Sequence, residues 1–276
     1  MQMTYREAYD KGRRELLSEE ADQDALILLE FVTGASRNDL YIHPERELSD
    51  EEVKTFLSFI ERRKTGEPVQ YITGKTYIYG LEILCDKNVL IPRFDTEILI
   101  DEAIRRIPKS AKVLDLCTGS GAIALCVKHE REDLTLTASD ISNDALCVAK
   151  KNSEHLNLNV TFIESDMFEN IDGEFDCILS NPPYIVSQVV EELESTVKDY
   201  EPRRALDGGT DGLDFYRIIA KEAKKYLKGE SLLIMEIGYD QGESVSELLS
   251  LENYKDIEVI KDLNGLNRVV SAKFGG

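Results

Sequence analysis

The sequence reads Val113-Leu114-Asp115-Leu116-Cys117-Thr118-Gly119-Ser120-Gly121-Ala122 at the point that decides its fold. The opening residues form a short apolar run typical of a buried strand, and a helical pattern begins at the last residue. Glycines at such a strand-to-helix turn let a ligand approach the backbone closely. We therefore predict an α/β fold with a ligand-binding turn at this position.

Strands and helices alternate along the second part of the chain. Strands are predicted at Lys112–Cys117, Leu134–Asp140, Val160–Asp166, Phe175–Ser180 and Ser231–Ile237, and helices at Ala122–His129, Asn143–His155 and Leu213–Leu227. This alternation is typical of a parallel sheet covered by helices. The final strands, Ile257–Lys261 and Arg268–Phe274, are joined by a connection too short for a parallel crossover. We predict a Rossmann-like, mostly parallel seven-stranded sheet with a terminal antiparallel hairpin.

The first part of the chain has a helical pattern. Apolar residues recur at helical spacing from Ala25 to Val32, and Gly34 is a helix stop signal. Ser49-Asp50-Glu51-Glu52 matches the capping box that begins a further helix. We predict a small helical domain without strands at residues 1–74, a β-hairpin linker at 75–90 and a ligand-binding domain at 91–276.

Composition limits the classes of function. The net charge of -20 opposes a general nucleic-acid binder, because such proteins draw much of their affinity from neutralising phosphates. No apolar run approaches the ~20 residues of a membrane span, and the N-terminus has no hydrophobic signal core. The five cysteines lack C-x-x-C spacing, so we expect reduced thiols in a cytoplasmic protein and no metal site.

A second motif, Asn181-Pro182-Pro183-Tyr184, follows the predicted strand Phe175–Ser180. The prolines end the strand because neither can donate a ladder hydrogen bond, and Pro182 restricts the backbone of Asn181. The asparagine is therefore expected at the carboxyl edge of the sheet, where open α/β folds bind ligands. A rigid amide with an aromatic neighbour is suited to holding a planar –NH2 group.

The glycine turn is compatible with two cofactors. Gly119, Gly121 and Ala124 fit the loose dinucleotide pattern G-x-G-x-x-A, and Asp140 lies about 20 residues on, where an acid binds a ribose diol. A nicotinamide enzyme would place a pyrophosphate at this turn. Asp115 favours S-adenosylmethionine instead, because a carboxylate suits an ammonium group and not a pyrophosphate. At the end of the third strand, Asp166 is a candidate acceptor for the adenine amino group, beside Met167.

Both motifs together resemble class I S-adenosylmethionine methyltransferases that act on amino groups conjugated to a π system. Further segments resemble the release factor glutamine methyltransferase family: Glu67–Gly74, Val89–Arg93, Glu201–Gly209, Asp211–Tyr216, Glu236–Gly242, Asp262-Leu263 and Arg268–Val270. The resemblance runs from about Glu67 to Val270, and the helical N-terminal region fits that family's small helical domain. Cys117 stands where the family commonly has glycine, and Met167 where an aromatic residue is frequent.

The resemblance implies methylation of the glutamine amide in the Gly-Gly-Gln motif of peptide chain release factors, which tunes translation termination. S-adenosylmethionine would be the donor and S-adenosylhomocysteine the product. Asn181 and the backbone carbonyl of Pro182 would accept the two amide N–H groups, and Tyr184 would pack on the amide plane. The expected substrate site is Asn181, Pro182, Pro183 and Tyr184, and the expected cofactor site is Asp115, Cys117, Thr118, Gly119, Ser120, Gly121, Asp140, Asp166, Met167 and Asn181.

Three other functions are compatible with parts of the sequence. A nucleic-acid amino methyltransferase would hold an adenine or guanine –NH2 in the same way, but the acidic composition opposes it. A dehydrogenase and a non-catalytic binding protein would be distinguished by which cofactor binds, if any. We expect a monomer whose N-terminal domain recognises the protein substrate, with no direct nucleic-acid partner and no membrane association.

Overall fold

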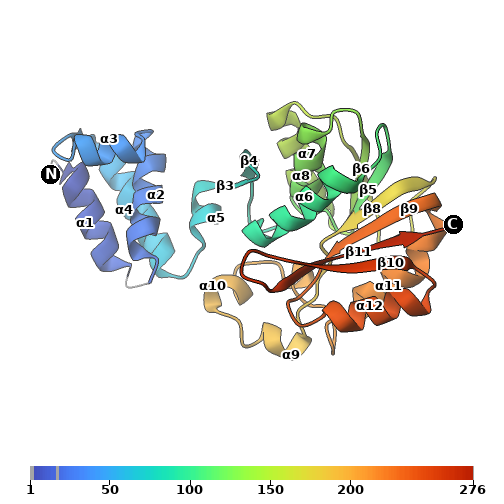
Figure 1. Cartoon of the computed structure of the whole chain (residues 1–276). Coiled ribbons are helices and arrows are strands. Elements are labelled where there is room, and N and C mark those ends of the chain that lie inside the picture. The colour runs from blue at the N-terminus through green and yellow to red at the C-terminus, as the bar shows by residue number, and fades with distance from the viewer. Residues whose placement is uncertain (1–2, 17–18, 276) are drawn as a thin grey trace. The chain divides into compact units, whose positions relative to one another are not determined.

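The computed structural model of the 276-residue chain describes residues 3–16 and 19–275, and residues 1–2, 17–18 and 276 of the predicted domains lie outside this part (Figure 1). The chain divides into two compact units. The first unit contains Met1–Gly74 and Glu194–Tyr200, and the second contains Lys75–Leu193 and Glu201–Gly276. The short segment Glu194–Tyr200 thus belongs with the N-terminal residues although it lies far along the sequence.

The first unit is a bundle of helices around its own apolar core. Its helices are α1 (Tyr5–Glu15), α2 (Ala21–Thr33), α3 (Arg37–Ile42), α4 (Asp50–Lys64), α5 (Val69–Thr73) and α10 (Ser195–Lys198). Gly34 ends α2 with φ of 64°, and the Ser49 hydroxyl and Glu52 carboxylate cap α4 reciprocally, as predicted. Phe56 and Ile60 lie on one face of α4 and are fully buried.

The prediction that this region lacks strands was wrong. Strands β1 (Met3–Thr4) and β2 (Glu47–Leu48) pair antiparallel, bringing the start of the chain beside the start of α4. Two-residue strands are too short to show an alternating pattern, so no sequence signal marks them. The segment after α10 is held to the same unit through Tyr200, whose hydroxyl donates to the backbone oxygen of Thr65 at 2.8 Å.

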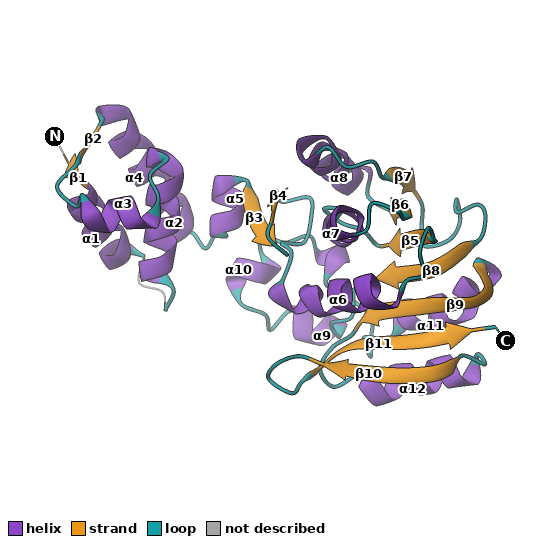
Figure 2. Cartoon of the chain, turned by 45° about the horizontal axis from the view of Figure 1, so that its top comes forward, coloured by secondary structure: helices purple, strands orange, loops and turns teal. Residues whose placement is uncertain are grey.

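The second unit is built on the predicted seven-stranded sheet, in the order β10-β11-β9-β8-β5-β6-β7 (Figure 2). Its strands are β5 (Lys112–Leu116), β6 (Thr135–Asp140), β7 (Thr161–Glu164), β8 (Phe175–Ser180), β9 (Leu227–Glu236), β10 (Lys255–Lys261) and β11 (Asn267–Phe274). Strands β7, β6, β5, β8 and β9 run parallel, and β11 pairs antiparallel with both β9 and β10. The predicted mostly parallel sheet with its terminal antiparallel hairpin is confirmed.

Helices cover both faces of this sheet (Figures 1 and 2). Helices α6 (Glu97–Arg106), α7 (Ala122–Glu130) and α8 (Asn143–Leu156) cover one face, and α11 (Asp214–Glu222) and α12 (Gly242–Leu251) cover the other. Alternate residues of β5 enter opposite cores, with Val113 on the first face and Leu114 on the second. Shorter turns of helix are α9 (Ser187–Val190), η1 (Phe94–Thr96), η2 (Arg203–Ala205) and η3 (Ala223–Lys225).

The predicted helix Leu213–Leu227 is too long at its carboxyl end. Helix α11 ends at Glu222, and Leu227 is already the first residue of β9. The reason is sheet pairing. Leu227 lies opposite Phe175 of β8, and the Phe175 N–H donates to the carbonyl of Tyr226 at 2.7 Å. A ladder with a distant strand overrides the local helical pattern here.

The predicted β-hairpin is present as β3 (Lys75–Ile78) and β4 (Leu81–Leu84), joined at Gly80. It lies within the second unit. The fully buried Asn152 of α8 accepts a hydrogen bond from the Leu84 N–H at 2.7 Å and donates to the carbonyls of Leu84 and Ser120, each at 2.9 Å. One amide therefore fastens the hairpin to the glycine turn. The three-part domain division stays a prediction.

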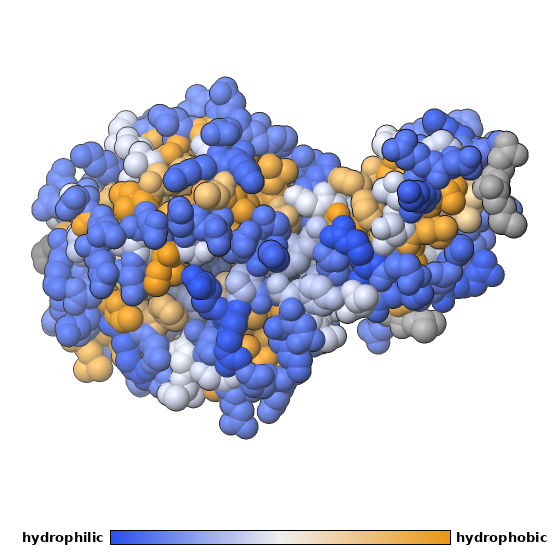
Figure 3. Space-filling view, turned by 180° about the vertical axis from the view of Figure 1, so that it is seen from behind, coloured by the Kyte–Doolittle hydropathy of each residue, from blue (hydrophilic) through white to orange (hydrophobic). Residues whose placement is uncertain are grey.

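None of the described helices has the length and apolar character that crossing a membrane requires. The face shown in Figure 3 is covered largely by hydrophilic residues, with hydrophobic residues in smaller patches. This surface is consistent with the acidic composition, since Asp and Glu number 53 against 33 Lys and Arg.

Candidate active site

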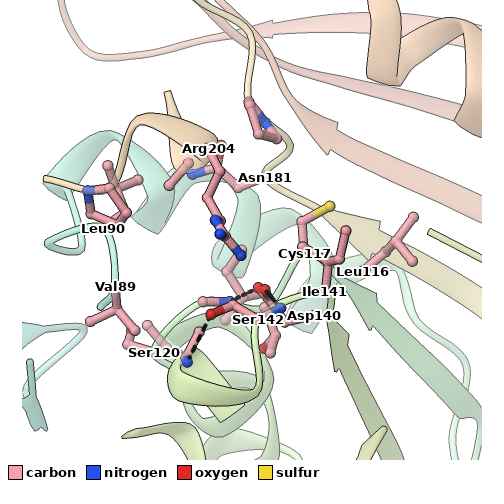
Figure 4. Close-up of a pocket in the computed structure, with 18 of the residues that line it drawn as sticks. Val89, Leu90, Leu116, Cys117, Ser120, Asp140, Ile141, Ser142, Asn181 and Arg204 are labelled. Atoms are coloured by element: carbon pink, nitrogen blue, oxygen red, sulfur yellow. Dashed lines mark hydrogen bonds between the residues drawn. The ribbon is translucent and has the colours of Figure 1, made fainter. Parts of the chain in front are cut away.

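A cavity of about 550 Å³ lies in the second unit, at the carboxyl edge of β5, β6 and β8 (Figure 4). This volume is in the range of sites for small molecules and cofactors, which is about 300–1,000 Å³. Nine of the predicted site residues line it: Cys117, Thr118, Gly119, Ser120, Asp140, Asp166, Met167, Asn181 and Pro183. Because parallel strands end at one edge, segments far apart in sequence meet here.

Asp115 and Gly121 support the glycine turn and do not line the cavity. The Asp115 carboxylate is fully buried, and its Oδ2 accepts from the Thr118 hydroxyl at 2.5 Å and from the Ala124 N–H at 3.3 Å. Burial raises the pKa of Asp115 to about 7. Gly121, the N-cap residue of α7, has φ of 83°, and a Cβ there would lie 3.1 Å from Cβ of Ala149. The turn is therefore fixed by groups packed behind it.

Asp140 lies at the end of β6 and faces the cavity (Figure 4). Its Oδ2 accepts from the Gly119 N–H and its Oδ1 from the Ser142 N–H, both at 2.9 Å. Burial raises the pKa of Asp140, and these backbone N–H groups and the charge of Arg204 act against that rise. The Asp140 carboxylate is thus held in place beside the glycine turn by one hydrogen bond to each of its oxygens.

Asn181 lies just beyond the end of β8, and its side chain contacts Thr96. Asn181 Nδ2 donates to Thr96 Oγ1 at 3.5 Å. The preceding residue, Ser180, donates through its hydroxyl to the Leu116 carbonyl at 2.7 Å, which ties the ends of β8 and β5 together. Asn181 and the glycine turn therefore belong to one rigid edge.

The backbone of Tyr184 is enclosed by two segments that follow later in the chain, Asp207–Gly212 and Gly238–Gly242. The Tyr184 carbonyl accepts from Gln241 Nε2 at 2.9 Å. A Cβ on Gly208 would lie 2.7 Å from Cα of Tyr184, and one on Gly212 would lie 2.5 Å from the Tyr184 oxygen. These glycines are required because the two backbones touch. Pro182 and Tyr184 do not themselves line the cavity.

Another part of the cavity rim is formed where Val89–Arg93 meets the segment that begins at Glu201. The buried Glu201 carboxylate accepts from the Ile91 N–H at 3.1 Å and forms an ion pair with Arg93. Burial raises the pKa of Glu201, and the Arg93 charge opposes this. The pair sets the next residues, including Arg204, beside the cavity (Figure 4).

Comparison with known proteins identifies the family. Residues 7–74 match the family model for the PrmC N-terminal domain, and residues 93–198 match the model for the methyltransferase small domain. The chain is 43% identical over 261 residues to the release factor glutamine methyltransferase of Clostridium acetobutylicum, covering 92% of each chain. It is 40% identical over 249 residues to that of Geobacter sulfurreducens, covering 90% of this chain and 88% of the relative.

The chain belongs to the release factor glutamine methyltransferase family. Among solved structures, a methyltransferase from Pyrococcus furiosus is similar in fold, with a TM-score of 0.56 at 18% identity over 72% of this chain and 91% of that one. At this identity the likeness concerns the fold alone.

Sequence reasoning missed several residues that line the cavity in this member of the release factor glutamine methyltransferase family. They are Asn88, Val89, Leu90, Pro92, Thr96, Ile141, Ser142, Ala145, Arg204 and Phe215. Ile141 and Ser142 directly follow Asp140, so their position beside the strand end was a usable signal. The rim segments Val89–Arg93 and Glu201–Gly209 were marked only by their resemblance to the family. No local pattern placed them at the cavity, because the partner of Arg93 lies 108 positions away.

Two lining residues of this family member have backbone conformations that favour glycine. Cys117 has φ of 62° and Met167 has φ of 46°, and their sulfur atoms lie 3.9 Å apart across the cavity wall. Burial raises the pKa of the Cys117 thiol well above its usual value. A left-handed conformation costs a residue with a Cβ about 1–2 kcal/mol.

We expect Cys117→Gly to be more stable than Cys117→Ala by about 1 kcal/mol, because both variants lose the sulfur and only alanine keeps the strained Cβ. Chemical denaturation of both variants, with their m-values compared, measures this difference. Equal unfolding free energies for the two variants would contradict a strained backbone at this position.

Proposed function

We infer that this chain transfers a methyl group from S-adenosylmethionine to the side-chain amide nitrogen of glutamine in the Gly-Gly-Gln motif of peptide chain release factors. S-adenosylhomocysteine is the second product. The observation that carries this function is the Asn181 amide, fixed at the same edge of the sheet as the glycine turn and lining the same cavity, in a chain of this family. Methylation of the release factor would tune translation termination.

The residues of the cavity fit S-adenosylmethionine. Asp140 presents a half-buried carboxylate to the cavity at the strand end, suited to a ribose diol. Gly119 has φ of 55°, and a Cβ added there would meet open space, so the turn is accessible to a ligand. Met167 and Ile141 add apolar wall, and Asp166 lines the same cavity with a carboxylate of the kind that accepts hydrogen bonds from an amino group. When bound, the cofactor supplies an electrophilic methyl group on a sulfonium.

The chain's own contribution to the reaction is positioning. An amide nitrogen is a poor nucleophile, because its lone pair is delocalised into the carbonyl. Asn181 Oδ1 accepts one substrate N–H and the Pro182 carbonyl accepts the other, which aligns the nitrogen and draws electron density towards it. A strong general base is not needed, because an N-protonated amide loses its proton readily. Tyr184 excludes water from the substrate side.

The competing function is amino methylation of a nucleic acid, which uses the same grip on –NH2. The net charge of -20 favours a protein substrate. The decisive test incubates the enzyme and labelled S-adenosylmethionine with purified release factor, with RNA and with DNA. We expect label in the release factor and, by mass spectrometry, a methyl group on the Gly-Gly-Gln peptide. Label in nucleic acid alone would overturn the proposal.

Recognition of the release factor by the N-terminal unit remains a proposal. It is supported by the match of residues 7–74 to the PrmC N-terminal domain and by the small size of a tripeptide motif as a recognition element. The monomeric state and the cytoplasmic location stay predictions.

We expect Asp140→Ala to weaken S-adenosylmethionine binding at least about tenfold, because a hydrogen bond to a charged group contributes about 1.5–3 kcal/mol. Isothermal calorimetry on the full chain measures the affinity. Asp144→Ala is the matched control, since Asp144 is exposed on the first turn of α8 and does not line the cavity. Unchanged affinity in the Asp140 variant would contradict the ribose contact.

A further inference from the structure

An arginine side chain reaches into the cavity from its rim. Arg204 lines the cavity, and its guanidinium extends towards Asp140 and Ser142 (Figure 4). Among the described residues that line the cavity, Arg204 is the sole cation. Within residues 3–16 and 19–275 its guanidinium forms no ion pair and no hydrogen bond. Its donors are therefore available to a bound ligand.

The backbone that carries Arg204 is fixed on both sides. Before it in the chain, the buried Glu201 carboxylate accepts from the Ile91 N–H at 3.1 Å. After it, the carbonyl of the buried Leu206 accepts from the Ile185 N–H at 3.0 Å, and Ile185 directly follows the Asn-Pro-Pro-Tyr motif. The short turn η2 between these two contacts is thus held beside the cavity, and the exposed Arg204 side chain projects from it.

The neighbouring arginine on the same turn has different contacts. Arg203 forms an ion pair with Glu191 and a second one with Asp207 at 3.1 Å, and it does not line the cavity. Both arginines are exposed. The turn therefore presents two guanidinium groups of equal charge, one paired with surface carboxylates and one directed at the cavity. Arg203 is for this reason a matched control for Arg204.

The charges that line the cavity complement those of S-adenosylmethionine. The described lining has two carboxylates, Asp140 and Asp166, and the single cation of Arg204. The cofactor has the reverse set, with two cationic groups (the sulfonium and the ammonium) and one carboxylate. Both oxygens of Asp140 already accept backbone N–H groups at 2.9 Å, which satisfies that carboxylate without Arg204. The carboxylate of the cofactor is then the natural partner of this arginine.

We propose that Arg204 binds the carboxylate in the methionine part of S-adenosylmethionine. The proposal rests on the cofactor assigned in the proposed function. A guanidinium offers a planar fork of N–H donors that matches a carboxylate, and it is more weakly hydrated than an ammonium. The sulfonium of the cofactor lies between its ribose and its carboxylate. Asp140 at the ribose and Arg204 at the carboxylate therefore restrain the methyl donor from both sides.

The test measures the binding of two ligands to the full chain by isothermal calorimetry. One is S-adenosylmethionine, and the other is decarboxylated S-adenosylmethionine, which lacks the carboxylate alone. We expect Arg204→Gln to raise the Kd of S-adenosylmethionine about tenfold, because a charge-assisted contact is lost. The Kd of the decarboxylated ligand should change less than about twofold, since its partner for Arg204 is already missing. Arg204→Lys keeps the charge without the fork and should weaken S-adenosylmethionine binding about threefold.

The control is Arg203→Gln, which removes the same charge from the same turn outside the cavity. Both affinities should stay within about twofold of wild type, because exposed ion pairs contribute little. Binding of the decarboxylated ligand also reports that each variant folds. Equal weakening of both ligands by Arg204→Gln would place the arginine on the ribose or adenine, and unchanged affinity for S-adenosylmethionine would remove it from the site. Either result overturns the proposal. Failure of the wild-type chain to bind S-adenosylmethionine would instead overturn the cofactor assignment.

Discussion

Asn181→Ala is expected to lower kcat for release factor methylation at least about 100-fold, because one precisely placed hydrogen-bond acceptor contributes about 2.7–4 kcal/mol at a transition state. The neighbouring Pro182 offers only its backbone carbonyl, which in the proposed geometry already accepts the other N–H. Steady-state kinetics with labelled S-adenosylmethionine measures the change. We expect the Kd for S-adenosylmethionine to change much less than kcat, because Asp140 and the glycine turn are intact.

The matched control is Asn143→Ala, which removes an exposed amide at the start of α8, outside the cavity. This variant should methylate release factor at nearly the wild-type rate. Near-normal turnover in the Asn181 variant would mean that the amide is not the group that holds the glutamine, and the assignment of the site would fail.

Gly208→Ala is expected to lower kcat by about 100-fold through displacement of the Asn-Pro-Pro-Tyr loop, since shifts of about 1 Å in a reacting group have effects of this size. The added Cβ would lie 2.7 Å from Cα of Tyr184 and 2.9 Å from the Pro183 oxygen. Both are backbone atoms, so no side chain can rotate to relieve the contact. We also expect the variant to lose about 1–3 kcal/mol of folding stability. Chemical denaturation measures this loss, and kinetics on the folded variant measures the fall in kcat separately.

Gly173→Ala provides the comparison for Gly208→Ala. Gly173 has φ of 94° and open space around an added Cβ, so alanine there strains the backbone without a clash. We expect this variant to lose about 1–2 kcal/mol of stability and to retain turnover close to wild type. If both glycine variants kept full activity, the close packing on Tyr184 would have no part in holding the substrate.

The edge of the sheet was predictable from the sequence. Strand and helix patterns alternate from Lys112 onward, and in a parallel sheet all strand ends meet on one side. Gly119 and Asn181 follow such strands and Asp140 ends one, so their meeting at one cavity follows from topology. The capping box at Ser49 was equally readable, because cap and helix lie within a few residues.

Contacts between distant segments were not predictable in this way. Glu236 reaches Tyr184 over 52 positions, and Glu201 reaches Arg93 over 108. A single pair of this kind leaves no periodic signal. The same reason explains why the helix predicted to run to Leu227 ends early, since the pairing partner of Leu227 is in β8.

The predicted contact between Asp115 and the ammonium group of the cofactor stays a prediction. The hydrogen bonds of the Asp115 side chain in the structure are with Thr118 of the glycine turn and Ala124 of α7.

The chain passes between its two units after residues 74, 193 and 200. The N-terminal unit is therefore not an appended module that a single cut could remove. Deleting residues 1–74 would leave Glu194–Tyr200 behind in the remaining chain, with the Tyr200 hydroxyl deprived of its Thr65 partner. Glu201 directly follows Tyr200 in the chain, and its carboxylate accepts the hydrogen bond from Ile91 at the rim of the cavity. Domain exchange between relatives would thus need matched junctions at all three crossings.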